Sequence, residues 1–125
     1  MIGYVTLGTN DLPRAAAFYD GLLSLLGAKR AFEMDRLIGW STGPGAPMLA
    51  VAKPFDESPA TAGNGTMVAL AVNSPEQVDA IYKKALELGA TSEGEPGPRA
   101  GGVFYIGYFR DLDGNKLDAF CMMPK

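Results

Sequence analysis

Few side chains in this sequence can carry acid–base chemistry, and none of them is a histidine. The absence of histidine from the 125 residues removes the commonest metal ligand and the commonest general base near neutral pH. Asp118 lies in a predicted strand, 116–122, and is a candidate general base, because desolvation would raise its pKa. The carboxylate could instead pair with a cationic ligand, pair with a nearby arginine, or lie exposed at the rim of a site. Tyr4 is the second candidate for acid–base work.

Arg99 is the side chain best suited to bind an anion. It lies in a predicted loop, 94–102, whose other residues are mostly glycine, proline and alanine, and it has little packing role there. A guanidinium group can bind a carboxylate or phosphate through two parallel hydrogen bonds, so Arg99 could close over an anionic substrate. A solvated charge on a loop is the alternative interpretation.

Three aromatic side chains are candidates for lining a site with Asp118. Tyr108 belongs to the predicted strand that precedes Asp118, and Phe120 shares the face of Asp118 by alternation. Trp40 is the only tryptophan; it could form the floor of a binding cleft or pack in the core.

Composition and missing motifs exclude several classes of function. A net charge of −3 argues against nucleic-acid binding, which requires a basic surface. No apolar run approaches the ~20 residues of a membrane span, and the N-terminus does not resemble a signal peptide. A lone cysteine, Cys121, excludes an internal disulfide and favours a cytoplasmic location. The sequence contains no glycine-rich phosphate loop, nucleophile elbow or zinc-ligand spacing, and we expect no cofactor.

An internal repeat predicts how these residues are positioned. Shifted by 63 residues, 4–25 aligns with 67–88, and seven of the 22 pairs are identical. Such a repeat indicates two copies of one supersecondary unit that bury their apolar faces together. Periodicity and turn signals predict a β-α-β-β-β order in each copy, hence an α+β fold with two modules in tandem that form a curved mixed sheet around a cleft. We expect one domain, 1–125, with module one at 1–54, a linker at 55–65 and module two at 66–125.

The repeated strand predicts which face is open. Val5 and Leu7 are kept in the second copy and should pack on the helix, whereas Tyr4, Thr6 and Gly8 have diverged to other residues. A sheet with one helix leaves its second face uncovered, so the diverged positions should line a cleft. Tyr4 and its repeat mate Met67 could also be ordinary apolar contacts.

The duplicated order, the opening 4–12 (YVTLGTNDL) and the ending 110–118 (RDLDGNKLD) resemble the vicinal-oxygen-chelate superfamily of glyoxalases, bleomycin-resistance proteins and extradiol dioxygenases. The resemblance covers essentially the whole chain, and it implies the tandem fold more strongly than any one activity. The superfamily's metal enzymes hold a divalent ion with His, Gln or Glu from the first and last strands of each copy. The corresponding positions are Tyr4, Leu49, Met67 and Asp118.

These four side chains do not suit a hard divalent ion, so we expect no metal site. Leucine has no donor atom, a thioether is soft, and a phenol must lose a proton whose pKa is ~10.

The resemblance then implies a protein that binds a small organic molecule in an aromatic and apolar cleft, with Asp118 and Tyr4 available for acid–base work. The expected ligand contacts are Tyr4, Thr6, Trp40, Leu49, Met67, Arg99, Tyr108 and Phe120. Two alternatives remain: a metal-dependent lyase or dioxygenase with atypical ligands, and a module that binds another protein. Relatives often form homodimers, and we expect one here.

Overall fold

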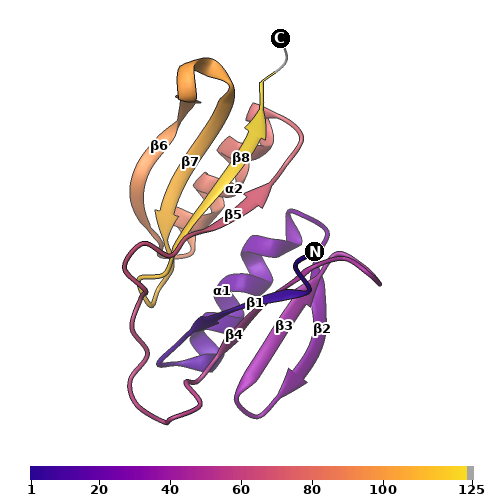
Figure 1. Cartoon of the computed structure of the whole chain (residues 1–125), viewed down its shortest axis with the longest axis vertical. Helices are drawn as coiled ribbons and strands as arrows, with labels where there is room; N and C mark the ends of the chain where they lie inside the picture. The colour runs from indigo at the N-terminus through magenta and orange to yellow at the C-terminus, as the bar shows by residue number, and fades with distance from the viewer. Residues whose placement is uncertain (124–125) are drawn as a thin grey trace. The chain divides into compact units, whose positions relative to one another are not determined.

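The computed structural model describes residues 1–123, and its contacts divide the chain into two compact units, Met1–Ala62 (unit 1) and Gly63–Lys125 (unit 2). Each unit has the order β-α-β-β-β, so the predicted α+β class and the tandem modules are confirmed (Figure 1). The boundary between the units falls within 55–65. Neither helix of the described residues is long and apolar enough to cross a bilayer.

Unit 1 is a four-stranded sheet packed against one helix. The sheet order is β1-β4-β3-β2, with β1 parallel to β4 and the other neighbours antiparallel. The elements are β1 (Tyr4–Gly8), α1 (Leu12–Ser24), β2 (Lys29–Met34), β3 (Leu37–Ser41) and β4 (Met48–Ala52).

Unit 2 repeats this topology with the order β5-β8-β7-β6, and β5 is parallel to β8. A short 3₁₀ turn, Ala100–Gly102, joins its second and third strands. The elements are β5 (Val68–Ala71), α2 (Pro75–Glu87), β6 (Thr91–Arg99), β7 (Phe104–Arg110) and β8 (Lys116–Met122).

Both helices begin at capping residues that satisfy otherwise unpaired backbone donors. The Asp11 carboxylate accepts from the Arg14 amide at 3.1 Å. The Ser74 hydroxyl accepts from the Gln77 amide at 3.2 Å, and the Gln77 side chain accepts in return from the Asn73 amide at 2.7 Å. This reciprocal capping box is the one that the Ser-Pro-Glu-Gln sequence predicts.

The core of each unit lies between its helix and one face of its sheet. In unit 1, Tyr19 of α1 packs on Trp40 of β3, with their ring centroids 5.7 Å apart. In unit 2, Ile81 of α2 and the strand residues Phe109 and Leu117 are buried. Burial of alternate residues on one face leaves the opposite face of each sheet for other contacts.

Strand β6 is longer than the sequence predicts. We expected a strand only to residue 95 and a loop over 94–102, whereas β6 continues to Arg99. Its pairing with β7 shifts register between Ser92 and Gly94 and again between Gly94 and Gly97. The strand therefore contains bulges where its glycines lie. Proline is tolerated because β6 is an edge strand, where an N–H can be missing without breaking the sheet. The loop interpretation of 94–99 is therefore wrong.

Candidate functional site

The face of the unit 2 sheet opposite α2, which we name the helix-free face, brings together four of the nine predicted site residues: Arg99, Tyr108, Asp118 and Phe120. Alternate residues of β7 point toward α2: the Tyr105 hydroxyl donates to Asp79 at 2.8 Å, and a Cβ added to Gly107 would lie 3.4 Å from the Tyr82 ring. The intervening residues therefore point the other way. Cross-strand pairing places Tyr108 beside Asp118, and Ile106 beside Phe120, on this face.

Asp118 is the unusual group of this face. Asp118 is only 3% exposed, and its buried Oδ1 atom has no hydrogen-bond partner among residues 1–123. Burial raises the pKa of this carboxyl group from 3.8 to about 6, an effect that the nearby Lys116 ammonium partly opposes. A buried acceptor without a partner costs free energy unless something donates to it. The structure thus differs from the alternatives of an arginine-paired or rim-exposed carboxylate.

Two cations lie over the Tyr108 ring next to Asp118. The Arg99 guanidinium carbon lies 5.6 Å from the centroid of this ring, and the Lys116 ammonium nitrogen lies 5.3 Å from it. These distances are within the range of cation–π attraction. A third cation of the face, Arg110, is ion-paired with Glu93 on the neighbouring strand. Within residues 1–123, neither Arg99 nor Lys116 has such an ion pair.

Arg99 is held in place over two glycines of its own strand. Its guanidinium donates to the carbonyl oxygens of Glu95 at 2.8 Å and Pro98 at 3.1 Å. A Cβ added to Gly97 would lie 3.0 Å from Nη1, and one added to Gly94 would lie 3.6 Å from Nη2. The missing side chain of Gly97 therefore leaves space that the guanidinium occupies, whereas Gly94 is required by its backbone, which has a φ of 155°. Arg99 is a positioned, half-buried charge on a strand and not a solvated charge on a loop.

The other end of the helix-free face is apolar. Phe104 and Phe120 meet edge to face, with ring centroids 6.1 Å apart, and Ile106 is the cross-strand neighbour of Phe120. All three side chains are half-buried. The face therefore combines an aromatic end with a charged end along the same two strands.

In unit 1, only part of the predicted site lies on the face opposite α1. Thr6 and Tyr4 point away from the helix, and Tyr4 is 62% exposed. Met67 precedes β5 in unit 2 and is 43% exposed.

Trp40 and Leu49 lie on the other face of the unit 1 sheet. They are cross-strand neighbours, and the Trp40 indole N–H donates to the Asp20 carboxylate of α1 at 2.8 Å. Trp40 is 2% exposed, so the structure places it in the core, the second of its two predicted alternatives.

The expected correspondence between Leu49 and Asp118 is wrong by one residue. Asp118 pairs with Ala69, the repeat mate of Thr6, and Thr6 pairs with Ala50. The counterpart of Asp118 is therefore Ala50. The β3–β4 connection, 42–47, is one residue longer than the β7–β8 connection, 111–115, so aligning the two turns on their glycines shifts the following strand. A shift of one residue moves a side chain to the opposite face of a sheet.

Lys116 and the two glycines next to Arg99 are further residues of this face that were not predicted from the sequence. Alternation with Asp118 along β8 could have identified Lys116. Gly94 and Gly97 could not be identified in this way, because their role depends on the bulges of β6.

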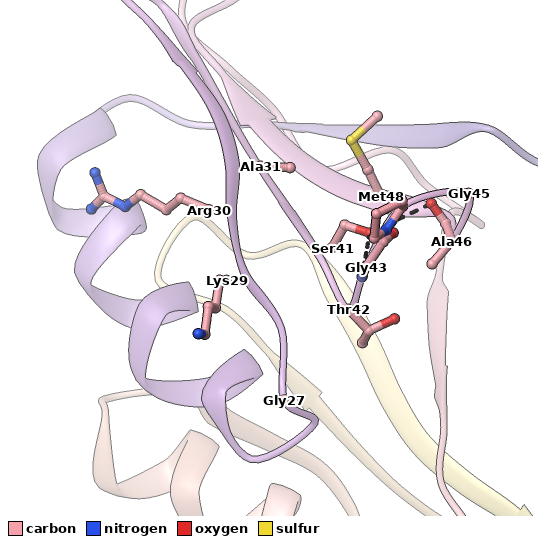
Figure 2. A pocket seen from close by; sticks show the side chains of 11 residues that line it. Gly27, Lys29, Arg30, Ala31, Ser41, Thr42, Gly43, Gly45, Ala46 and Met48 are labelled. Carbon is pink, nitrogen blue, oxygen red and sulfur yellow. Dashed lines mark hydrogen bonds between the residues drawn. The ribbon is translucent and has the colours of Figure 1, made fainter.

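A separate hollow of about 610 Å³ lies in unit 1 beside the β3–β4 connection (Figure 2). Its wall includes Ser41, Gly43, Met48 and the start of β2. Arg30, also at this wall, reaches α1 and pairs with Asp20 at 2.7 Å, which holds the pKa of that carboxyl group below its ordinary value. None of the predicted site residues lines the hollow.

The donor atoms do not fit a divalent metal of the kind the resemblance implies. With the corrected pairing, the four positions are Tyr4, Ala50, Met67 and Asp118, and only Asp118 offers a carboxylate. Within residues 1–123, no three His, Cys, Asp or Glu side chains gather where they could share an ion. Hard divalent ions require several oxygen or imidazole ligands.

Comparisons with known proteins agree with the tandem fold. A family model described as the Glyoxalase/Bleomycin resistance protein/Dioxygenase superfamily matches residues 1–119. No protein of curated function matches the chain.

Solved structures extend this likeness over nearly the whole chain. A glyoxalase/bleomycin resistance protein from Albidiferax ferrireducens is 35% identical, with a TM-score of 0.90 over 98% of this chain and 99% of that one. A hypothetical protein from S. aureus is 27% identical, with a TM-score of 0.76 over 97% and 92% of the two chains. A lactoylglutathione lyase from Agrobacterium tumefaciens is 22% identical, with a TM-score of 0.71 over 97% and 92%, a likeness that bears on the fold alone.

Proposed function

The chain belongs to the Glyoxalase/Bleomycin resistance protein/Dioxygenase superfamily, and we propose that it binds a small organic molecule at the helix-free face of unit 2, without a divalent metal. The single observation that carries the proposal is the buried Asp118 Oδ1 atom without a partner, beside the aromatic rings of Tyr108 and Phe120. A ligand that donates a hydrogen bond to this atom would remove the cost of leaving it unsatisfied.

The composition of the face supports a small ligand of mixed polarity. Small-molecule sites are mainly apolar and aromatic, with a few polar groups that fix orientation. Here Phe104, Ile106 and Phe120 supply the apolar surface, and Asp118 and Arg99 supply the polar groups. A carboxyl group with a pKa of about 6 can also take up or release a proton near neutral pH, so Asp118 is the candidate general base in this proposal.

Fragment binding followed by ¹H–¹⁵N NMR tests the proposal. Phenol and benzyl alcohol, added at millimolar concentrations, should shift amide signals of β7 and β8. Tyr108→Ala should abolish these shifts. Tyr105→Ala is the matched control, because it removes a tyrosine from the opposite face of the same strand. Shifts that are absent from β7 and β8, or that survive Tyr108→Ala, would contradict the proposed site.

Metal content tests the second part of the proposal. Protein purified without chelators should contain far less than one equivalent of Ni, Zn, Mn or Fe by elemental analysis. A stoichiometric metal that is lost in Asp118→Asn would instead support a metal-dependent lyase or dioxygenase with atypical ligands.

A further inference from the structure

The charges of the helix-free face indicate what its ligand carries. Arg110 is neutralised by Glu93, whereas Arg99 and Lys116 have no ion pair within the described residues 1–123. Two carboxylates, Glu93 and Asp118, lie near enough to Lys116 to act on it electrostatically, and Glu93 is already paired with Arg110. Three cations thus face two carboxylates, so an anionic ligand group would balance the remaining positive charge. A guanidinium group binds a carboxylate with directional, charge-assisted hydrogen bonds.

The placement of Arg99 supports a role in binding. Two backbone carbonyls and the Tyr108 ring hold the guanidinium over Gly94 and Gly97. Because this long side chain is already ordered without a ligand, binding loses less side-chain entropy. Two hydrogen bonds to carbonyls use only some of the five N–H donors of a guanidinium group. The remaining donors can face a ligand.

Besides an anionic group, the ligand must carry a hydrogen-bond donor for Asp118. The buried Oδ1 atom of Asp118 can only accept a hydrogen bond while the carboxylate is ionised, so the ligand must present a donor there. The Lys116 ammonium and the Arg99 guanidinium lie over the ring of Tyr108, and Tyr108 is the cross-strand neighbour of Asp118. The ligand should therefore carry its anionic group and its donor as two separate groups on one small body.

We propose that the ligand bound at this face is an organic carboxylate with an apolar, planar body and a separate hydrogen-bond donor. The carboxylate binds to Arg99 and Lys116, the donor faces Asp118 Oδ1, and the apolar body lies against Phe120 and Ile106. This inference rests on the proposed function, since it names the class of molecule that the same face binds.

A matched set of indoles tests it by isothermal titration calorimetry and NMR. Indole-5-carboxylate carries the donor and the anion at opposite ends of a rigid ring. Indole-5-carboxamide removes the charge, (indol-5-yl)methylamine reverses it, and 1-methylindole-5-carboxylate removes the N–H donor. We expect the carboxylate to bind roughly tenfold tighter than the carboxamide and the methylamine, as for one charge-assisted contact. We expect indole-5-carboxylate also to bind more tightly than its N-methyl analogue, by a smaller but measurable factor.

Variants of Arg99 and Asp118 test which residue causes the preference for the carboxylate and which causes the preference for the N–H donor. Arg99→Gln should abolish the preference for the carboxylate. Arg36→Gln is the matched control, because Arg36 also stacks on an aromatic ring, at 5.2 Å, and donates to a backbone carbonyl, but in unit 1. Asp118→Leu should abolish the advantage of the N–H donor, with NMR spectra used to check that each variant is folded.

The outcomes separate this inference from the proposed function. If the carboxamide or the methylamine binds as tightly as the carboxylate at β7 and β8, the face binds small molecules but the anionic class is wrong. The class is also wrong if Arg99→Gln leaves the carboxylate preference unchanged. If none of the four indoles shifts any signal of β7 or β8 at millimolar concentration, both the inference and the proposed function fail.

Discussion

The buried carboxyl group of Asp118 should make the stability of unit 2 depend on pH in a defined direction. Its pKa is 3.8 in an ordinary environment and about 6 in the folded chain, because burial disfavours the charged form. The folded state therefore holds this proton more tightly than the unfolded state. The stability that the proton contributes is fully present below pH 3.8 and is lost as pH rises through 6.

The two pKa values set the size of the effect. A difference of about 2.2 between them corresponds to about 3 kcal/mol of unfolding free energy, lost mainly between about pH 4 and pH 7. Asp118→Asn removes the titrating group and keeps the shape of the side chain. Part of this loss has already occurred at pH 4, where the unfolded carboxyl group is partly ionised. Relative to the wild type, the variant should therefore gain about 2.5 kcal/mol between pH 4 and pH 8, whatever its stability at pH 4.

Urea unfolding followed by far-ultraviolet circular dichroism, at intervals of pH from 4 to 8, measures this difference. Asp35→Asn is the control, because the Asp35 side chain is exposed in the β2–β3 turn and water can solvate its charge. A free-energy difference between wild type and Asp118→Asn that stays constant with pH would refute the argument. A difference of the opposite sign would mean that Lys116 stabilises the carboxylate more than burial disfavours it.

Three further substitutions test the placement of other residues. Gly97→Ala should displace Arg99, because the added Cβ would lie 3.0 Å from Nη1. Binding of indole-5-carboxylate, measured by calorimetry, should then weaken several-fold, and unchanged binding would refute the role of Gly97 in positioning Arg99. Trp40→Phe should lower the free energy of unfolding by about 2–4 kcal/mol, since it removes core volume and a hydrogen bond to a carboxylate; a loss below about 1 kcal/mol in urea titrations would contradict the core placement. Asn10→Ala should speed proteolytic cleavage near residue 60, because the Asn10 side chain makes two hydrogen bonds, at 2.7 and 3.1 Å, to the backbone of Ala60; an unchanged cleavage rate would show that these bonds do not restrain the segment.

The repeat and the local signals were sufficient to predict the fold. Val5 and Leu7 are identical in the two copies and mark the first strand of each module. The capping box at Ser74 and the glycines after the helices mark where helices begin and end, because these signals act over a few residues of sequence. Alternation also predicted correctly that Asp118 and Phe120 share a face, and pairing adds Tyr108 to it. These features depend on periodicity, which a sequence displays directly.

The features that could not be predicted depend on register and on tertiary contacts. The predicted position of Leu49 was wrong because the 42–47 connection has one additional residue. This residue reverses the face to which each side chain of the following strand points, and the sequence does not show at which position of the turn the additional residue lies. The strand at Arg99 was missed because proline and glycine usually end strands, whereas pairing with β7 tolerates them here. The burial of Asp118 could not be predicted for a related reason: the sequence shows a polar residue on a strand but not which side chains surround it.

The position of Arg99 over Gly97 has an evolutionary consequence. A relative that acquires a larger side chain at position 97 cannot keep the guanidinium in the same place, because even a Cβ there would lie 3.0 Å from Nη1, and a relative that loses the arginine no longer needs this glycine. The two positions should therefore change together across related sequences. Members of the superfamily that retain both would share a preference for anionic ligands, and members that have lost them would have to recognise their ligands by other means.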